Sequence, residues 1–364
     1  MRVLRRLAAI FVAQALPAAA IGAAAGLALA SPAALAQTPE PAPRQVPARN
    51  LAVPTTVSPQ MQRIVNGPLR ANWDLLPKTG EEWKALADAG AAATMKNVPI
   101  WREHLHVKVE PAVMDGVKAF WVTPDVVAPE NRDRLLVHVH GGCYVFGPGE
   151  AGTAEAILMA GFGHIKVLSV DYRMPPEAYF PAALDDAMTV WKAVLKTNDP
   201  KRVGFIGTSA GGALTLEMAL RAKELGLPLP GAIASGTPMS DVTKTGDTFH
   251  TNEMVDNVLV STSGFCDAAA AFYAHGHDLA DPLLSPVNGD MHGFPPTILT
   301  SGTRDLLLSN TVRVHRKLRN AGVDAFLQVF EAQAHAEYLR DDTAPETKEA
   351  FEEIAGFFDK HLAK

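Results

Sequence analysis

The residue with the clearest chemical context in this chain is a serine between glycines. Residues 207–211, Gly-Thr-Ser-Ala-Gly, match the pattern G-x-S-x-G, follow an apolar run and precede an apolar helical segment. At a sharp turn from strand to helix, a serine points its hydroxyl outward, and glycine two positions to either side leaves room for the neighbouring backbone. This context predicts that Ser209 is a nucleophile.

The partners that a nucleophilic serine needs follow it in the chain. A serine hydroxyl is a weak nucleophile until a histidine removes its proton, and an acid must orient that histidine. Asp305 comes shortly after the apolar run 296–302, and His335 comes shortly after the run 325–331. Parallel strands bring their carboxyl ends to one edge of a sheet, so both side chains are expected beside Ser209. The order Ser, Asp, His suits this arrangement.

Other acids and histidines near the end of the chain are weaker candidates. Asp281 and Asp290 also precede the last strands, but Asp281 lies in D-P-L-L-S-P, where an aspartate typically starts a turn. His315 falls inside an expected helix, and His361 falls inside the final one. An ordinary surface position for His335 is the alternative to a catalytic one.

A glycine pair before the serine is the candidate for stabilising negative charge. His140-Gly141-Gly142 follows an apolar run, and glycines there let the backbone approach a substrate closely. The N–H groups of Gly141, Gly142 and Ala210 would then form an oxyanion hole for an attacked carbonyl. His140 is expected to position the loop by hydrogen bonds. An ordinary glycine turn is the alternative.

Short apolar runs alternate with helical segments through most of the chain. Two runs around the turn at Asp115-Gly116 predict an antiparallel hairpin. The runs that follow predict a parallel sheet buried on both faces, because they are continuous and separated by helices. They are residues 134–140, 166–172, 202–208, 231–237, 296–302 and 325–331. Helices are expected from Ala210 to about Leu225 and over 309–322, and residues 60–96 look helical.

Several motifs in one order resemble the hormone-sensitive-lipase-like branch of the α/β-hydrolase superfamily, the bacterial carboxylesterases with an H-G-G-G motif. The resemblance covers about residues 106–364 and implies an α/β-hydrolase fold: a mostly parallel eight-stranded sheet with helices on both faces and a helical cap. The motifs are HGGCYVFG, DYRMPPEAYFPAALDDA, GTSAGG, SGTRDLLLS and His335 after the last strand.

The resemblance also assigns roles to residues. It implies a catalytic triad of Ser209, Asp305 and His335, and no cofactor. It implies that Asp171-Tyr172-Arg173 and the turn after it brace the core. Cap elements are expected at about residues 60–105 and 240–276, within one domain from residue 60 to residue 364.

Three positions depart from the family pattern. The fourth glycine of H-G-G-G is Cys143, the acid before the nucleophile is Thr208, and the usual D-Y-R-L-A-P-E reads D-Y-R-M-P-P-E. A cysteine side chain would narrow the acyl site or alter the third donor, and a threonine removes a charge near Ser209. None of the three removes a triad residue.

The first residues of the chain predict export. Three arginines precede an alanine-rich apolar run, and Ala34-Leu35-Ala36 matches a signal-peptidase site, so residues 1–36 are expected to be a cleaved signal peptide. A permanent membrane anchor is the alternative. Residues 37–59 hold six prolines and are expected to form an extended leader. The expected location is therefore periplasmic or secreted, with no stable membrane anchor after cleavage.

Charge and metal-ligand types narrow the possible partners. The chain has a formal net charge of −6, and losing the arginine-bearing signal segment would make it more negative, which argues against nucleic acid. The histidines form no zinc pattern, so no metal is expected. Cys143 and Cys266 are expected to be small buried side chains, and a disulfide between them is the less favoured alternative.

These inferences converge on an exported serine carboxylesterase that hydrolyses short to medium acyl esters through an acyl-enzyme. A lactone hydrolase or an acyltransferase would use the same residues. A ligand-binding protein without turnover is the remaining alternative, although such proteins usually lose a triad residue. The expected partner is a small-molecule ester or lactone, and a homodimer is possible.

Overall fold

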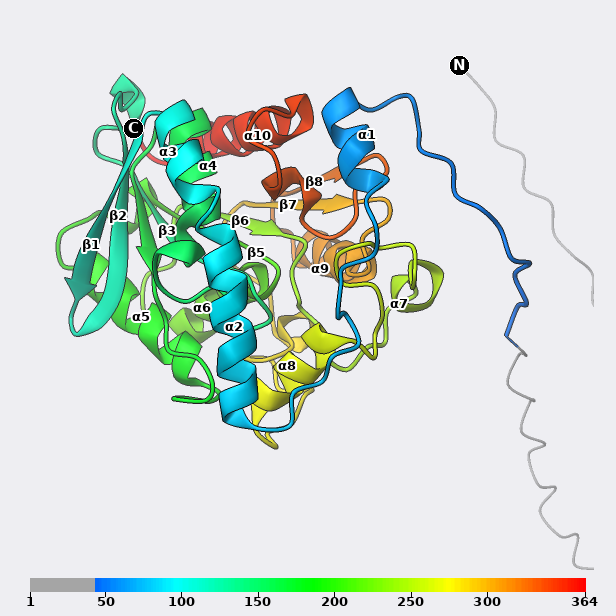
Figure 1. Cartoon of the computed structure of the whole chain (residues 1–364). Helices are drawn as coiled ribbons and strands as arrows, with labels where there is room; N and C mark the ends of the chain where they lie inside the picture. The colour runs from blue at the N-terminus through cyan, green and yellow to red at the C-terminus, as the bar shows by residue number, and fades with distance from the viewer. Residues whose placement is uncertain (1–42) are drawn as a thin grey trace, which may run out of the picture. The chain divides into compact units, whose positions relative to one another are not determined.

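The computed structural model describes residues 43–364, so the expected signal peptide lies outside the described residues. Its centre is an eight-stranded sheet in the order β1-β2-β4-β3-β5-β6-β7-β8 (Figure 1). The strands are β1 (Val107–Met114), β2 (Val117–Pro124), β3 (Leu135–Val139), β4 (Val167–Val170), β5 (Val203–Thr208), β6 (Ala232–Gly236), β7 (Thr297–Gly302) and β8 (Ala325–Phe330).

The sheet is parallel from β4 to β8 and antiparallel at its first edge. The β1–β2 hairpin closes at Asp115-Gly116 and pairs with β4 in the antiparallel sense. Strands β3 to β7 are buried at every position, because helices cover both of their faces. The predicted mostly parallel sheet and its leading hairpin are confirmed.

Helices cover both faces of the sheet (Figure 1). On one face α4 packs against α10, and their apolar side chains meet Leu136 and Ile206. The other face holds α5, α6 and α9, whose side chains pack with Val137 and Phe205. Their bounds are α4 (Ala154–Gly163), α5 (Ala182–Val194), α6 (Ala210–Glu224), α9 (Leu308–Asn320) and α10 (Pro345–His361).

The remaining helices come from the two segments predicted to form a cap. The first segment holds α1 (Pro59–Val65), α2 (Gly80–Thr94) and α3 (Val98–His104); the second holds α7 (Thr248–Thr251) and α8 (Phe265–Ala274). Trp83 of α2 stacks on Phe272 of α8 at 5.5 Å between ring centroids, so the two segments pack on each other.

The expectation of helix throughout residues 60–96 is wrong between α1 and α2. Pro68 and Pro77 lie in this stretch, and proline cannot donate the backbone hydrogen bond that a continuing helix needs. Helix α2 instead starts afresh at a capping box: Glu82 N–H donates to the Thr79 hydroxyl, while the Glu82 carboxylate accepts from Thr79 N–H.

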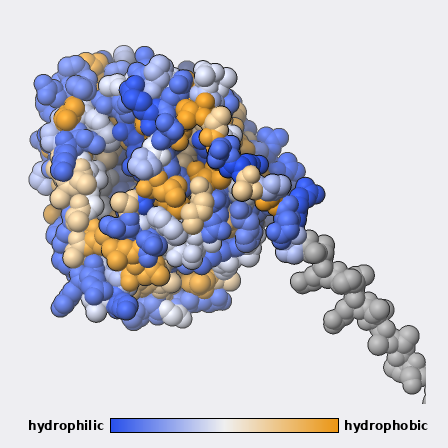
Figure 2. Space-filling view, turned by 45° about the vertical axis from the view of Figure 1, so that its right-hand side comes forward, coloured by the Kyte–Doolittle hydropathy of each residue, from blue (hydrophilic) through white to orange (hydrophobic). Residues whose placement is uncertain are grey.

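Residues 51–364 form one compact unit. One face of the surface is mainly hydrophilic, with hydrophobic residues gathered in separate patches (Figure 2). Within the described part of the chain, no helix combines the length and the apolar character needed to cross a bilayer.

Candidate active site

Ser209 occupies the turn between β5 and α6 in a conformation that is rare for a residue with a side chain. Its φ is 63° and its ψ is −122°. A side chain at Gly207 or Gly211 would overlap the carbonyl oxygen of Val139, which is why both positions need glycine. Ser209 N–H donates to the Gly236 carbonyl at 2.9 Å. The predicted sharp turn with an outward serine therefore matches the backbone observed.

Asp305 and His335 lie together at the carboxyl edge of the sheet. The Nδ1 atom of His335 is 3.1 Å from Oδ1 of Asp305, and both side chains are almost fully buried. The hydroxyl of Thr237 donates to the other carboxylate oxygen, as does the Ser301 hydroxyl at 2.9 Å. These donors hold the Asp305 carboxyl group in place, so that it can orient the imidazole of His335.

The buried carboxylate of Asp256 joins the two loops that carry Asp305 and His335. One of its oxygens accepts from Leu306 N–H at 2.8 Å and from His335 N–H at 3.2 Å. Its other oxygen accepts from the N–H groups of Val258 and Leu259. Asp256 lies in the segment between β6 and β7, so this segment ties the loop of Asp305 to the loop of His335.

The serine and the histidine are linked through their neighbours. Among the described residues, no hydrogen bond joins Ser209 Oγ to His335, a contact that is often loose without substrate. The Thr208 hydroxyl, however, is 2.8 Å from the hydroxyl of Tyr338, three residues after the histidine. The turn that carries Ser209 and the loop that carries His335 therefore share a buried hydrogen bond.

A buried glutamate supplies a carboxyl group beside Thr208, where the family pattern places an acid. The Thr208 hydroxyl donates to Glu155 Oε1 at 2.6 Å. The other Glu155 oxygen is 3.2 Å from His138 Nε2, and His138 Nδ1 is 2.8 Å from Ser169 Oγ. The carboxyl group at this place therefore comes from α4 rather than from the nucleophile turn.

The loop after β3 approaches the nucleophile closely. A β-carbon at Gly141 would lie 2.6 Å from the Thr208 carbonyl oxygen and 3.2 Å from Cβ of Ser209. Gly142 has a φ of 116°, which a residue with a side chain rarely adopts. Gly141 therefore lies against the turn that carries Ser209, and Ala210 follows Ser209 directly in the chain, while an oxyanion hole formed by Gly141, Gly142 and Ala210 stays a prediction.

His140 and Tyr172 support the loop after β3 through ring stacking and hydrogen bonds. Their rings stack at 4.1 Å between centroids, and Tyr172 donates to the His140 carbonyl at 2.7 Å. Nδ1 of His140 lies 2.8 Å from the Gly141 carbonyl oxygen. Burial lowers the pKa of His140 to about 4, so its ring is neutral and serves as a support.

Cys143 and Cys266 form a disulfide, so the expectation of two unpaired cysteines is wrong. They are 123 residues apart in sequence, and the bridge fastens the loop after β3 to helix α8. Sequence spacing does not show that the two cysteines lie close together; the packing of α8 against the loop after β3 brings them into contact.

The weaker sequence candidates have partners of their own. Asp281 accepts from Leu283 N–H at 2.8 Å and contacts His277. Asp290 binds the ammonium of Lys223 at 3.1 Å. His315 lies in α9 and His361 is the last residue of α10. Local contacts therefore account for Asp281 and Asp290, and the two histidines lie in helices, as the sequence predicted.

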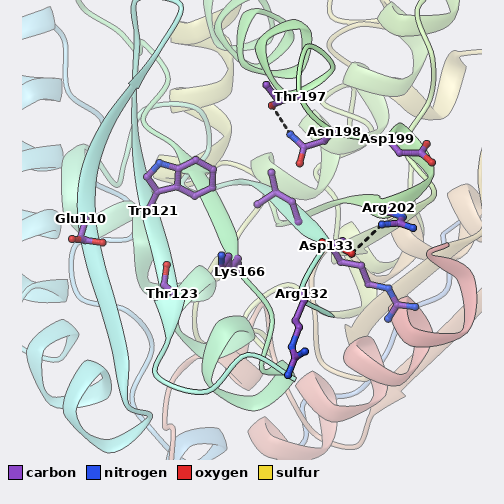
Figure 3. Close-up of a pocket in the computed structure, with 12 residues that line it drawn as sticks. Glu110, Trp121, Thr123, Arg132, Asp133, Lys166, Thr197, Asn198, Asp199 and Arg202 are labelled. Atoms are coloured by element: carbon purple, nitrogen blue, oxygen red, sulfur yellow. Dashed lines mark hydrogen bonds and ion pairs between the residues drawn. The ribbon is translucent and has the colours of Figure 1, made fainter. Parts of the chain in front are cut away.

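Two cavities differ in their relation to this site. A small one, of about 30 Å³, lies beside the acid loop and is lined mainly by apolar side chains, including Met239, Phe249, Leu259, Cys266, Leu306 and Leu307. A groove of about 680 Å³ lies at the opposite edge of the sheet, where β3 and β5 begin (Figure 3). Its lining includes Trp121, Arg132, Asp133, Lys166 and Arg202, and no triad candidate.

Comparison with known proteins identifies the family. A family model described as the alpha/beta hydrolase fold matches residues 136–339. An acetyl-hydrolase of Streptomyces hygroscopicus is 29% identical over 246 residues, which cover 67% of this chain and 81% of that protein. An esterase of Acinetobacter venetianus is 27% identical over 252 residues, which cover 69% and 82%.

Solved structures agree. The crystal structure of esterase E25 has a TM-score of 0.85 and 44% identity, covering 88% of this chain and 99% of that one. An esterase from the bacterial hormone-sensitive lipase family has a TM-score of 0.66 and 26% identity, covering 79% of this chain and 100% of that one. The chain belongs to the α/β-hydrolase family, and the resemblance to its hormone-sensitive-lipase-like branch is confirmed.

The predicted enzyme class, a carboxylic ester hydrolase, is confirmed by the same relatives. Residues 43–364 contain no group of three or more His, Cys, Asp or Glu side chains arranged to hold a metal ion. Sequence reasoning missed Thr237, Asp256 and Glu155. Of these, Glu155 left a signal: it is a lone charge in the otherwise apolar run that forms α4.

Proposed function

We propose that this protein is an exported serine carboxylesterase whose triad is Ser209, Asp305 and His335. The observation that carries the proposal is the buried Asp305–His335 pair beside a strained serine turn. His335 takes the hydroxyl proton as Ser209 attacks the ester carbonyl, and then protonates the leaving alcohol. Water, activated by the same histidine, releases the acid from the acyl-enzyme.

The negative charge of the tetrahedral intermediate would rest on backbone N–H groups of Gly141, Gly142 and Ala210. Each such donor contributes roughly 2.7–4 kcal/mol to the transition state in a water-poor site. The close approach of Gly141 to Ser209 supports this assignment. Asp305 stays ionised throughout and stabilises the imidazolium.

Short acyl groups fit the space beside the acid loop. Its volume of about 30 Å³ holds about two water-sized groups. No triad candidate lines the cavity itself, but three of its lining residues are neighbours of the triad candidates: Leu306 and Leu307 directly follow Asp305, and the backbone N–H of Met239 donates to the Ser209 carbonyl at 3.0 Å. The name of the acetyl-hydrolase relative agrees with a small acyl group.

The decisive experiment replaces the nucleophile. Ser209→Ala should lower kcat/KM on p-nitrophenyl acetate and butyrate by at least about a thousandfold, because no other group can form the acyl-enzyme. Ser263→Ala, a change at an exposed serine of the cap, is the matched control and should keep wild-type activity. Retained turnover in folded Ser209→Ala would reject the triad.

Export is a separate part of the proposal. A disulfide persists in an oxidising compartment and is rare in the bacterial cytosol, so the Cys143–Cys266 bridge supports a periplasmic or secreted location. The full chain expressed in a bacterial host should appear in the periplasm or medium with Gln37 as its first residue, as read by intact mass. A cytoplasmic protein that keeps its first residues would contradict export.

A further inference from the structure

The loop that carries the oxyanion donors has an unusual backbone. Three consecutive residues have positive φ: Gly142 at 116°, Cys143 at 51° and Tyr144 at 62°. Glycine adopts such angles freely, but each residue with a side chain pays roughly 1–3 kcal/mol there. Such a run persists only where surrounding contacts hold it in place.

Helix α8 supplies two of those contacts, at consecutive loop residues. Cys266 in its first turn is bonded to Cys143, and Tyr273 near its end stacks on Tyr144 at 4.6 Å between ring centroids. The Tyr144 hydroxyl also donates to Glu217 of α6 at 2.6 Å. The loop is therefore bonded covalently to α8 through Cys143 and hydrogen-bonded to α6 through Tyr144.

Cys143 and Tyr144 must be held in place because the proposed donors, Gly141 and Gly142, directly precede them in the chain. Phe146 N–H donates to the Gly142 carbonyl at 2.8 Å, so the backbone folds back on itself straight after the second proposed donor. Rotation about the N–Cα bond of Cys143 toward the ordinary negative φ would turn the peptide between Gly142 and Cys143, break the hydrogen bond from Phe146 N–H to the Gly142 carbonyl and release the backbone that carries the Gly142 N–H. Donors of an oxyanion hole must lie within a few tenths of an ångström of their place to act.

We propose that the Cys143–Cys266 disulfide is a positioning element for catalysis: it holds the oxyanion loop in its left-handed conformation and thereby aims the donors of Gly141 and Gly142. The inference rests on the proposed function of this loop. It gives a reason for a cysteine where the family pattern has a fourth glycine, because the bridge offsets the strain that a side chain adds at this φ.

The bland alternative is a bridge that serves stability alone. A disulfide that closes a loop of about a hundred residues stabilises a fold by up to about 4.7 kcal/mol in the chain-entropy account. If the bridge only stabilises the fold, a variant without it should keep the wild-type kcat at temperatures where that variant is folded. A positioning role would lower kcat and weaken the binding of tetrahedral analogues, with little change in KM.

The test uses two variants that both lack the bridge. Cys143→Ala with Cys266→Ala keeps a side chain at the left-handed position, whereas Cys143→Gly with Cys266→Ala restores the family glycine. Both are assayed on p-nitrophenyl acetate well below their melting temperatures, together with inhibition by phenylboronic acid, which forms a tetrahedral adduct on the serine.

The alanine variant should lose at least about tenfold in kcat and bind phenylboronic acid about tenfold more weakly. The glycine variant should recover most of both losses, because glycine accepts the angle without the bridge. Folded variants that both stay within about twofold of wild type would overturn the proposal. An alanine variant and a glycine variant with equal losses would also contradict it.

A second measurement serves if the variants do not fold. Wild-type protein is treated with dithiothreitol, which transfers two electrons and two protons to the bridge. Cys143 and Cys266 then become thiols, and dithiothreitol itself is oxidised to a cyclic disulfide. Once two thiols are counted, phenylboronic acid binding should be weaker; unchanged binding would overturn the proposal. Labelling of wild type but not Ser209→Ala by a fluorophosphonate tests the proposed nucleophile separately.

Discussion

The two edges of the central sheet hold polar side chains in opposite ways. At the amino edge, the groove of Figure 3 is wide, and its charges face solvent: the Arg202–Asp133 pair is 3.2 Å apart and Asp133 is 78% exposed. At the carboxyl edge Asp256, Asp305 and His335 are buried, and each has defined partners.

Cavity size and buried polar contacts do not coincide in this fold. The volume of the amino-edge groove is more than twenty times that of the cavity beside Asp305. Its Arg202–Asp133 ion pair lies at the surface, however, and such pairs contribute little to stability. Burying a carboxylate is costly unless every lone pair finds a donor, so a saturated buried cluster indicates a functional demand. The predictions below test this contrast.

Among the variants that compare the two edges, the largest effect is expected at Asp256. Asp256→Asn would place an amide NH₂ group against one pair of the N–H groups from which the carboxylate now accepts hydrogen bonds. The loops that carry Asp305 and His335 would then loosen. A shift of about 1 Å can cost about a hundredfold, so kcat should fall by roughly that factor.

Asp290→Asn, at an exposed acid in contact with Lys223, is the matched control and should keep its kcat. A double variant with Asp305→Asn separates a positioning role from a general one. Once the triad acid is gone, Asp256→Asn should cost little more in kcat, whereas a full additive loss would contradict coupling to the triad.

A smaller effect is expected at Thr208. Thr208→Val removes the hydroxyl that joins Glu155 to Tyr338 and leaves both buried groups without that partner. The free energy of unfolding should fall by about 1–3 kcal/mol, and kcat should fall about tenfold. Thr208→Ser keeps the hydroxyl and should lie near wild type in both denaturation and kinetics; equal losses in the two variants would rule out the hydrogen bond as the cause.

A pH effect on stability, with little change in turnover, is expected at Glu217. Burial raises the pKa of this carboxyl to about 8 from 4.5, so the folded protein holds a proton that the unfolded chain releases. Stability should therefore fall as pH rises from about 5 to 8, by up to about 1.4 kcal/mol per pH unit. Glu217→Gln removes the titrating group, and its denaturation midpoints should vary less with pH than those of wild type.

The smallest effect is expected at the amino edge. Arg132→Gln and Lys166→Gln change the charge of the groove in Figure 3 and should leave kcat and KM within about twofold. A large loss of turnover in either variant would break the contrast between the two edges. Arg134 differs, since it is buried and binds Asp359 at 2.9 Å; Arg134→Met should lower the melting temperature without lowering kcat.

Local patterns made the nucleophile and the sheet predictable. The glycines around Ser209 are required by contacts within the same turn, and the buried strands are short continuous apolar runs. The partners of the triad left no such pattern. Thr237 and Asp305 are 68 residues apart, and Asp256 and His335 are 79 apart, so only the folded chain brings them together.

The same limit applied to the disulfide and to the cap. Cys143 meets Cys266 because α8 packs over the loop after β3, which no spacing in the sequence encodes. The break between α1 and α2 was readable from Pro68 and Pro77, but the acids and apolar spacing around them favoured helix. Tertiary contacts decide such positions.

The φ of 63° at Ser209 also bears on how this chain can change. Every molecule folds with roughly 1–3 kcal/mol of backbone strain at that one residue. A glycine there would accept the same angle freely, so selection for stability alone would remove the nucleophile. Replacing Ser209 with glycine would therefore stabilise the fold and leave a scaffold without activity. Only selection for turnover opposes this substitution.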